Sequence, residues 1–182
     1  MGDRDPQIRE LDAAETERRL AELAEVLVDA VDAGASVNFL RGLTPQAAEG
    51  FWRTQLPALQ AGSRRLLVAE VDGRIAGTVV LTFAHQPNQP HRGDISKMLV
   101  HRSCRKRGLG ARLLAEAEAT AARHGRTLLV LDTETGSAGE RLYTRAGWLR
   151  IGEIPGYALS VDGVPLSATF FYKQLPAQPP PR

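Results

Sequence analysis

The sequence predicts an α/β domain built on a mixed sheet, and three observations carry this prediction. Two β-rich segments surround Asp72-Gly73, which is typical of a β-hairpin. A strand, a helix and a second apolar strand then follow one another between residues 94 and 133, an order that requires a right-handed parallel crossover. Helical periodicity precedes the hairpin, and two more β-rich segments lie near the C-terminus. We therefore expect a single domain over residues 1–175, with the Pro-rich tail 176–182 disordered.

The first half of the chain is expected to begin with a short strand at residues 8–11. Asp12 has the capping-box spacing to Glu15 and begins a helix that ends near Gly34. A second helix begins at Thr44-Pro45, and Pro57 is expected to kink it or end it early. The linker 34–43 between these helices is either a substrate-facing loop or a plain connection.

The remaining elements follow from periodicity and turn residues. The expected strands and helices are the hairpin strands 64–71 and 74–84, the strand 94–100, the helix 109–123, the strand 127–133, the helix 137–147 and the late strands 148–159 and 168–175.

Composition narrows the class of protein. The chain has 182 residues, and 23 Lys and Arg oppose 21 Asp and Glu, so its near-neutral balance argues against a protein that coats nucleic acid. Its one cysteine, Cys104, cannot form an internal disulfide, which suits a reducing compartment. The sequence shows no signal peptide and no apolar run of membrane-spanning length. We expect a cytoplasmic protein without a nucleic-acid or membrane partner.

A basic, glycine-containing turn joins the central strand to the helix 109–123. Amides at a helix N-terminus lack internal partners, and the positive end of the helix dipole lies there, so such a turn suits a phosphate group. The alternative is a solvated basic helix start capped by glycine. A P-loop is excluded because the chain has no Gly-Lys pair, and the dinucleotide pattern fails at Leu113. The residues of the turn are Arg102, Arg105, Lys106, Arg107, Gly108 and Gly110.

Two motifs in this setting resemble those of the GCN5-related N-acetyltransferase (GNAT) family. Arg105-x-x-Gly108-x-Gly110 is similar to the loop that binds the pyrophosphate of acyl-CoA in that family. Leu142-Tyr143-x-x-x-Gly147-Trp148 matches the later helix, which carries a tyrosine and ends in a Gly-aromatic pair. The resemblance covers residues 65–175, and the segments LLVLDTETGSAGERLY, GEIPGY and FFYK resemble the tabtoxin-resistance acetyltransferase branch. Arg102 stands where many members have proline, and Gly136-Ser137 replaces an asparagine.

The resemblance implies a fold, a cofactor and the residues that bind it. The implied fold is a mixed, mostly antiparallel sheet with helices on both faces, in which the central strand splays from its parallel neighbour to admit the pantetheine arm. The implied cosubstrate is acetyl-CoA. The implied cofactor-binding residues are Met98, Leu99, Val100, Arg105, Lys106, Arg107, Gly108, Leu109, Gly110, Ala111 and Ser137.

Three residues are candidates for catalysis. Tyr143 matches the tyrosine that protonates the departing sulfur, although a tyrosine at the edge of the core would look the same. Asp94 has the spacing of the catalytic glutamate of histone-type members, and strand alternation would put it on one face with Ser96, Met98 and Val100. Asp132 ends the next parallel strand and could flank the same cleft. We expect Asp94 to be the base and Asp132 to hold the amine, the alternative being a structural cap or clamp.

These residues predict a reaction class and leave the acceptor open. We expect direct transfer of acetyl to a primary amine of a small amino-acid-like or antibiotic molecule. A peptide or protein amine, or a non-catalytic acyl-CoA-binding module, are the alternatives. The histidines share no metal-ligand spacing, so no metal is expected. The protein is expected to be a monomer or homodimer.

Overall fold

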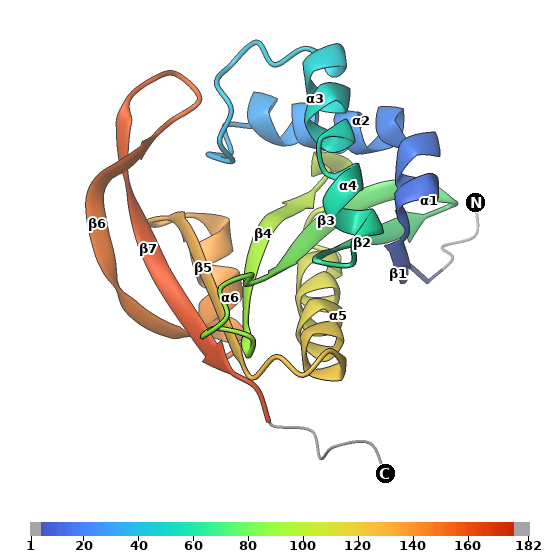
Figure 1. Cartoon of the computed structure of the whole chain (residues 1–182). Coiled ribbons are helices and arrows are strands. Elements are labelled where there is room, and N and C mark those ends of the chain that lie inside the picture. Colours follow the sequence, from blue (N-terminus) through green and yellow to red (C-terminus); the bar gives the residue numbers. More distant parts are fainter. Residues whose placement is uncertain (1–4, 177–182) are drawn as a thin grey trace.

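The structure is a computed structural model that describes residues 5–176, so that positions 177–182 of the expected disordered tail lie outside the described residues (Figure 1). The elements in chain order are β1 (Gln7–Leu11), α1 (Ala13–Arg18), α2 (Leu20–Asp32), α3 (Pro45–Arg53), α4 (Leu56–Gln60), β2 (Arg64–Val71), β3 (Arg74–Phe83), β4 (Arg92–Val100), the 3-10 turn η1 (Arg102–Cys104), α5 (Leu109–Arg123), β5 (Leu128–Glu134), α6 (Ala138–Arg145), β6 (Leu149–Leu159) and β7 (Pro165–Gln174).

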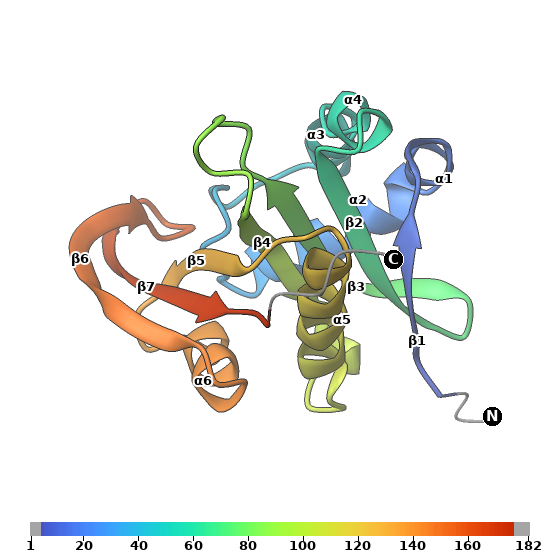
Figure 2. The same cartoon turned by 60° about the horizontal axis from the view of Figure 1, so that its bottom comes forward.

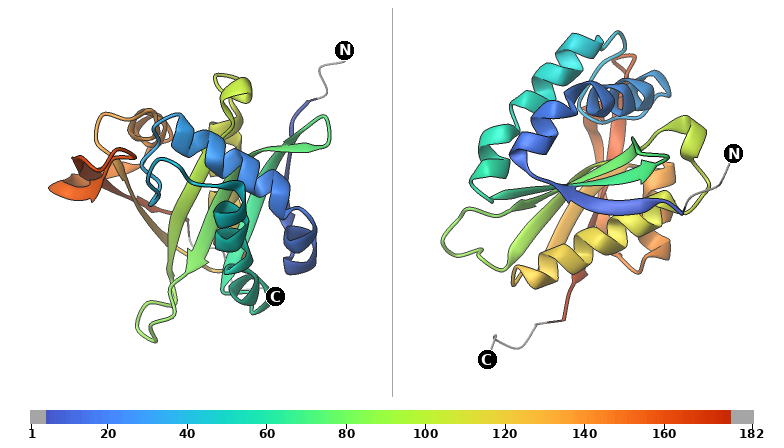
Figure 3. Two further views of the ribbon diagram at one scale, coloured as in Figure 1. Left: turned by 90° about the horizontal axis from the view of Figure 1, so that it is seen from above. Right: turned by 90° about the vertical axis from the view of Figure 1, so that its right-hand side faces the viewer.

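The strands form one seven-stranded sheet in the order β1-β2-β3-β4-β5-β7-β6. Only β4 and β5 are parallel neighbours, and the other adjacent pairs are antiparallel. Figure 3 shows α5 on one face of the sheet and α1 to α4 on the other, while Figure 2 shows α6 beside the curved β6–β7 arm. The expected mixed, mostly antiparallel sheet with helices on both faces is confirmed.

Each face of the sheet has its own apolar cluster. The cluster under α5 includes Leu113 and Leu114 together with Leu129 of β5. The cluster on the opposite face is built around Leu23, Leu27 and Trp52, which come from α2 and α3. Strand β4 packs between the two clusters, through Ile95 on one face and Leu99 on the other, whereas β5 packs on the α5 side through Leu129 and Leu131.

The N-terminal helices differ in one respect from the prediction. One helix was expected to run from Asp12 to Gly34, but the structure divides it at Arg19, whose φ of −112° and ψ of 19° interrupt the helical turn. Asp12 caps α1 by accepting from the Glu15 amide at 2.7 Å, whereas the Glu15 carboxylate turns to Arg9 and does not complete the capping box. Pro57 lies in the first turn of α4, so the expected early end of the preceding helix is confirmed.

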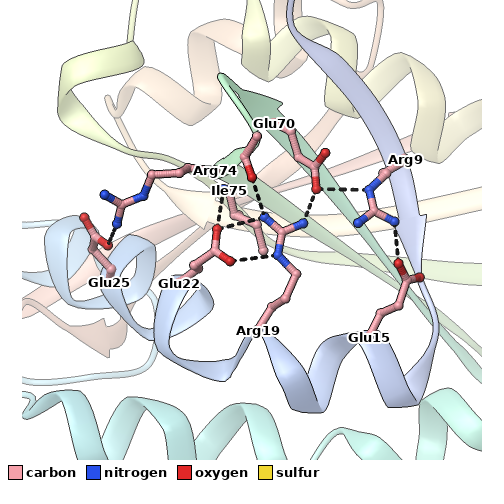
Figure 4. Close-up of polar contacts among 9 residues, drawn as sticks. Arg9, Glu15, Arg19, Glu22, Glu25, Glu70, Arg74 and Ile75 are labelled. Carbon is pink, nitrogen blue, oxygen red and sulfur yellow. Dashed lines mark hydrogen bonds and ion pairs between the residues drawn. The ribbon is translucent and has the colours of Figure 1, made fainter.

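The break at Arg19 belongs to an ion-pair network that we call the Arg19 cluster: Arg9, Glu15, Arg19, Glu22 and Glu70 (Figure 4). Arg19 donates to both carboxylate oxygens of Glu22 at 2.8 Å and also binds Glu70. Arg9 donates to Glu70 at 3.0 Å and to Glu15 at 2.7 Å. Because these residues come from β1, α1, α2 and β2, the cluster ties the N-terminal helices to the edge of the sheet.

Replacing Arg19 with methionine is expected to lower the free energy of unfolding by about 2 kcal/mol, because it leaves the Glu70 carboxylate, whose side chain is 13% exposed, without its second cation. The pKa of Glu22 is lowered chiefly by its hydrogen bond from Arg19. A lowered carboxylate pKa stabilises the fold above the unfolded pKa, and that stability is lost as the pH falls through the folded pKa. Urea unfolding should therefore show a difference that is largest near neutral pH and shrinks in acid.

Arg74→Met is the matched control for this prediction. Arg74 also pairs with a glutamate of α2, Glu25, but the two side chains are 70% and 53% exposed. Solvent screens such a pair, so its loss should change the unfolding free energy by no more than about 0.5 kcal/mol. Equal losses in the two variants would show that the Arg19 cluster is no more than a set of surface pairs.

Candidate active site

The two parallel strands of the sheet separate soon after they meet. β4 and β5 pair only from Arg92 opposite Leu128 to Asp94 opposite Val130. Beyond these positions β4 continues to Val100 and β5 to Glu134 without pairing with each other. The carboxyl-terminal halves of the two strands therefore form the sides of an opening in the sheet.

Strand β4 has a bulge just beyond the point where its pairing with β5 ends. The β3–β4 register shifts between Thr78 and Val80, and Lys97 takes up the left-handed conformation with φ of +49°. Thr78 donates its hydroxyl to the Lys97 carbonyl at 2.8 Å. Gly77 is required beside the bulge, because a Cβ there would lie 2.8 Å from the Leu99 carbonyl oxygen. The bulge is thus held by contacts with β3.

The bulge changes which β4 side chains share a face, and the predicted face is wrong. Ile95, Met98 and Val100 all pack in the cluster under α5, whereas regular alternation would place Ile95 opposite the other two. Asp94 therefore does not share a face with Met98 and Val100. An extra residue in one strand shifts the side-chain parity beyond it, which the sequence pattern of a regular strand does not anticipate.

A cavity of about 220 Å³ occupies the opening. Its walls come from the linker between α2 and α3, from β4 at the bulge, from the end of β5, from α6 and from the β6–β7 arm. The linker 34–43 contributes Ser36, Val37 and Asn38 to the cavity lining, which favours a substrate-facing loop over a plain connection. The polar and charged residues of its lining include Lys97, Asp132, Glu134, Tyr143 and Tyr157.

The pKa values of Asp132 and Tyr143, which both line this cavity, are both raised by desolvation. Asp132 lines the cavity and is an exposed residue, yet the surrounding protein desolvates its carboxylate enough to raise its pKa. Tyr143 is 5% exposed, and burial together with the charge of Asp132 raises its pKa above the usual range. Asp132 can accept a proton more readily than an ordinary aspartate, and Tyr143 stays protonated at neutral pH.

Lys97 is the site residue that the sequence reasoning missed. Burial lowers the pKa of its ammonium group, and the nearby charge of Asp132 acts in the opposite direction. Its Nζ lies 5.4 Å from the centre of the Phe51 ring, within the range of a cation–π contact. A signal was present, because regular alternation would put this lysine between Ile95 and Leu99 on a buried face.

Asp94 stands apart from this group. Its carboxylate accepts from Arg92 at 2.8 Å, its side chain is 42% exposed, and it does not line the cavity. The structure therefore does not bring Asp94 and Asp132 together across one cleft. It brings Asp132 together with Lys97 and Tyr143.

The basic turn is arranged differently from the expected convergence of four cations. Arg102 binds Asp29 of α2 through both its backbone amide, at 2.9 Å, and its guanidinium group. Arg105 donates to the Val100 carbonyl at 3.0 Å and so ties the turn to the end of β4. Lys106 and Arg107 remain exposed beside the N-terminus of α5. Because Asp29 lies 73 positions before Arg102 in the sequence, the local sequence pattern could not indicate this ion pair.

The glycines of the turn have distinct tasks. Gly108 caps α5 in the left-handed conformation, with φ of +79°, and offers no side chain above the first helical amides. Gly110 lies under α6, where a Cβ would be 3.4 Å from Leu142. Leu109 and Leu99 point into the two cores, so that only their backbone could contact a cofactor. Ala111 is exposed on the first turn of α5.

Ser137 caps α6, the helix that carries Tyr143. Its hydroxyl accepts from the Glu140 amide at 3.1 Å and lies 3.3 Å from the Thr133 hydroxyl. The Glu140 carboxylate in turn accepts hydrogen bonds from the Gly136 amide and, at 3.2 Å, from the Thr169 hydroxyl. These contacts give Glu140 a structural role. The cap joins the end of β5 to α6 and holds Tyr143 near Asp132.

Within residues 5–176, no group of three or more His, Cys, Asp or Glu side chains is arranged to hold a metal ion. None of the helices in that part of the chain combines the length and apolar character needed to cross a bilayer.

Several solved structures share this architecture. A protein described as an acetyltransferase of Salmonella typhimurium, solved with its cofactor acetyl-CoA, is 23% identical over 98% of both chains, with a TM-score of 0.76. A protein described as a phosphinothricin N-acetyltransferase is 22% identical over 94% of this chain and 99% of its own, with a TM-score of 0.76. A ribosomal-protein-alanine N-acetyltransferase from Brucella melitensis is 24% identical over 93% and 99%, with a TM-score of 0.73. At these identities the likeness shows a common fold.

The family is shown by the sequence itself. Residues 37–148, more than half of the chain, match the model of the Acetyltransferase (GNAT) family. This match includes the bulged β4, the basic turn, α5, β5 and α6, whereas the β6–β7 arm, which forms the remaining wall of the cavity, follows the matched residues. The chain therefore belongs to the GNAT acetyltransferase family.

Proposed function

We propose that this enzyme transfers the acetyl group of acetyl-CoA directly to the primary amine of a small amino-acid-like molecule. The observation that carries the proposal is the cavity of about 220 Å³ between the splayed strands, which brings Asp132 and Tyr143 together beside the bulge of β4. A cavity of this size suits a small acceptor better than a folded protein surface. The similar structure solved with acetyl-CoA supports the choice of donor.

In this proposal the cofactor runs from the basic turn into the opening. The amides at the start of α5, near Gly108 to Ala111, receive the pyrophosphate with Arg105, Lys106 and Arg107 around it. The backbone of Met98 to Val100 borders the pantetheine arm and the thioester carbonyl. Ser137, the N-cap of α6, is assigned a contact with the pantetheine arm.

The chemistry is assigned to Asp132 and Tyr143. Asp132 binds the incoming ammonium and takes up its proton, the neutral amine attacks the thioester carbonyl, and the C–S bond breaks as the tetrahedral intermediate collapses. Tyr143 donates a hydrogen bond or proton to the departing thiolate, and the extra proton on the attacking nitrogen restores the phenol or passes to the sulfur, so that the products are the amide and the CoA thiol. The sequence had suggested Asp94 as the base and Asp132 as the clamp. We assign both tasks to Asp132 because it is the carboxylate that lines the cavity with Tyr143.

The identity of the acceptor is proposed at the level of a class. The segments that resemble the tabtoxin-resistance branch suggest an amino-acid-like antibiotic, and one similar structure is described as a phosphinothricin N-acetyltransferase. Another is a ribosomal-protein-alanine N-acetyltransferase, so a peptide or protein amine is the competing acceptor. The third alternative is an acyl-CoA-binding module without turnover. We propose that the active form is a monomer or homodimer.

Release of CoA, followed chromatographically, tests the reaction. With acetyl-CoA held constant, free amino acids and amino-acid antibiotics should release CoA faster than peptides that carry the same N-terminal residue. Faster turnover of the peptides would favour the protein-amine alternative. Binding of acetyl-CoA with no release for any amine would favour the binding module.

Gly108→Asp tests the placement of the cofactor. The substitution introduces a negative charge beside the expected pyrophosphate and a side chain at a φ of +79°, so acetyl-CoA affinity should fall at least about tenfold, or about 1.4 kcal/mol. Gly108→Asn is the control, because asparagine tolerates the left-handed region and adds no charge. Calorimetry should show a much smaller loss for Asn. Equal losses of affinity in the two variants would mean that backbone strain alone weakens binding. Unchanged affinity in a folded Gly108→Asp variant would contradict the placement of the pyrophosphate at this turn.

A further inference from the structure

The charged residues that line the cavity fall on two opposite sides. Among residues 5–176 they are Lys97, Asp132 and Glu134. Lys97 comes from the bulge of β4, and the two carboxylates come from the end of β5. The cavity therefore has a cationic side and an anionic side across the opening between the two strands.

The backbone holds Lys97 on the cationic side. A lysine with φ of +49° is uncommon, because the left-handed region disfavours residues that carry a Cβ. The surrounding structure maintains this conformation through the Thr78 hydrogen bond to its carbonyl and the contact of Nζ with Phe51 of α3. Backbone strain of this kind is concentrated at functional sites.

The ammonium group of Lys97 is short of a counter-charge. No carboxylate of the described residues lies within 4.0 Å of its Nζ. Burial lowers its pKa and the charge of Arg64 lowers it further, while Asp132 opposes both from across the cavity. Burial makes the charged form of Lys97 energetically costly, and an anion bound beside it would offset that cost. A bound cation would do the same for the desolvated carboxylate of Asp132.

We propose that Lys97 is a specificity-determining residue that binds the carboxylate of the acceptor while Asp132 binds its amine. The substrate class is then the zwitterionic free amino acids and their analogues, in which an anionic group lies beside the reacting amine. Simple amines, amino-acid amides and peptide N-termini lack that carboxylate and leave Lys97 without a partner. This inference rests on the proposed acetyl transfer at the same site.

The test compares each free amino acid with its neutral amide. L-Methionine and L-methioninamide form one such pair, and the same comparison is made across the common L-amino acids. In the wild-type enzyme kcat/KM for the acid should exceed that for the amide by at least about tenfold. Lys97→Met should abolish this preference, chiefly through a higher KM for the acid. Lys97→Arg should retain it in part, and Lys97→Glu should reverse it in favour of the amide.

The acid-to-amide ratio separates recognition from a structural role. A merely structural lysine would change turnover of both acceptors together and leave the ratio unchanged, which would overturn the inference. Acetylation of Lys97 itself during turnover, detected by mass spectrometry, would also overturn it. Calorimetry with L-methionine in the presence of CoA provides a readout that does not depend on catalysis.

That binding measurement distinguishes failure of the inference from failure of the proposed function. If no amine releases CoA but L-methionine binds and Lys97→Met weakens that binding at least about tenfold, the acetyl transfer fails and carboxylate recognition by Lys97 stands. If CoA is released and the ratio does not respond to Lys97, the transfer stands and the recognition fails. Absence of both release and binding overturns both.

Discussion

Replacing Tyr143 with phenylalanine is expected to lower kcat by about a hundredfold or more while acetyl-CoA still binds. The substitution deletes the hydroxyl that would stabilise the departing thiolate. Because burial raises the pKa of this tyrosine, the hydroxyl remains protonated throughout the working pH range. A thiol has a pKa of about 8.5, and the raised pKa of Tyr143 makes full proton transfer from the phenol to the thiolate less favourable. We therefore expect a hydrogen bond from the phenol to the developing thiolate to supply much of the effect.

The Tyr143→Phe variant should retain its fold. The ring packs against Trp148 and Phe171, with centroid separations of 5.8 and 6.1 Å, and phenylalanine preserves both contacts. Tyr157→Phe is the matched control, because this second tyrosine also lines the cavity but is 50% exposed and packs on Phe170. Stopped-flow or steady-state kinetics on both variants is the measurement. Wild-type turnover in Tyr143→Phe would remove this residue from the mechanism.

Asp132→Asn is expected to reduce kcat/KM for the acceptor by about a hundredfold or more without lowering stability. Desolvation raises the folded-state pKa of Asp132 above its ordinary value. The folded state therefore binds the proton more tightly than the unfolded state does. The stability that the protonated form contributes is present below the unfolded-state pKa and is lost as the pH rises through the folded-state pKa. At neutral pH the ionised carboxylate costs stability, so the neutral asparagine should leave the melting temperature unchanged or raise it.

The pH profile gives this prediction a second readout. A base must be deprotonated to act, so a raised pKa places the acid limb of kcat/KM above the pH expected for an ordinary aspartate, and Asp132→Asn should flatten that limb. Asp94→Asn is the control, since its carboxylate pairs with Arg92 outside the cavity and its loss should have a small effect. The reverse pattern would assign the base to Asp94. Two unaffected variants would leave bulk water as the proton acceptor.

Features that depend on residues close together in the chain could be predicted from the sequence. The hairpin at Asp72-Gly73, the cap at Asp12 and the early helix end near Pro57 all follow from turn and capping chemistry within a few positions. The glycine that starts α5 and the tyrosine of α6 are recognisable for the same reason, because their spacing is local. The mixed sheet followed from the order of strands and the one crossover.

Features that depend on distant partners could not be predicted in this way. The bulge at Lys97 is held by Thr78 and Gly77 of β3, and it reversed the expected side-chain faces of β4. Arg102 was expected at the anion site but instead pairs with Asp29. The first helix breaks at Arg19, which binds Glu70, 51 positions further along the chain. Lys97 was overlooked because its place in the cavity depends on the same bulge.

The sequence by itself therefore determined the order of elements, the anion-suited turn and the family, since periodicity, caps and motif spacing are properties of neighbouring residues. Only the tertiary structure decided which charges meet. Side-chain parity along β4 depends on pairing with β3, and the opening that joins Lys97, Asp132 and Tyr143 exists because β4 and β5 stop pairing at Asp94 and Val130. Strand pairing and ion pairing are long-range interactions, and their outcome is set by the packed sheet rather than by any local pattern.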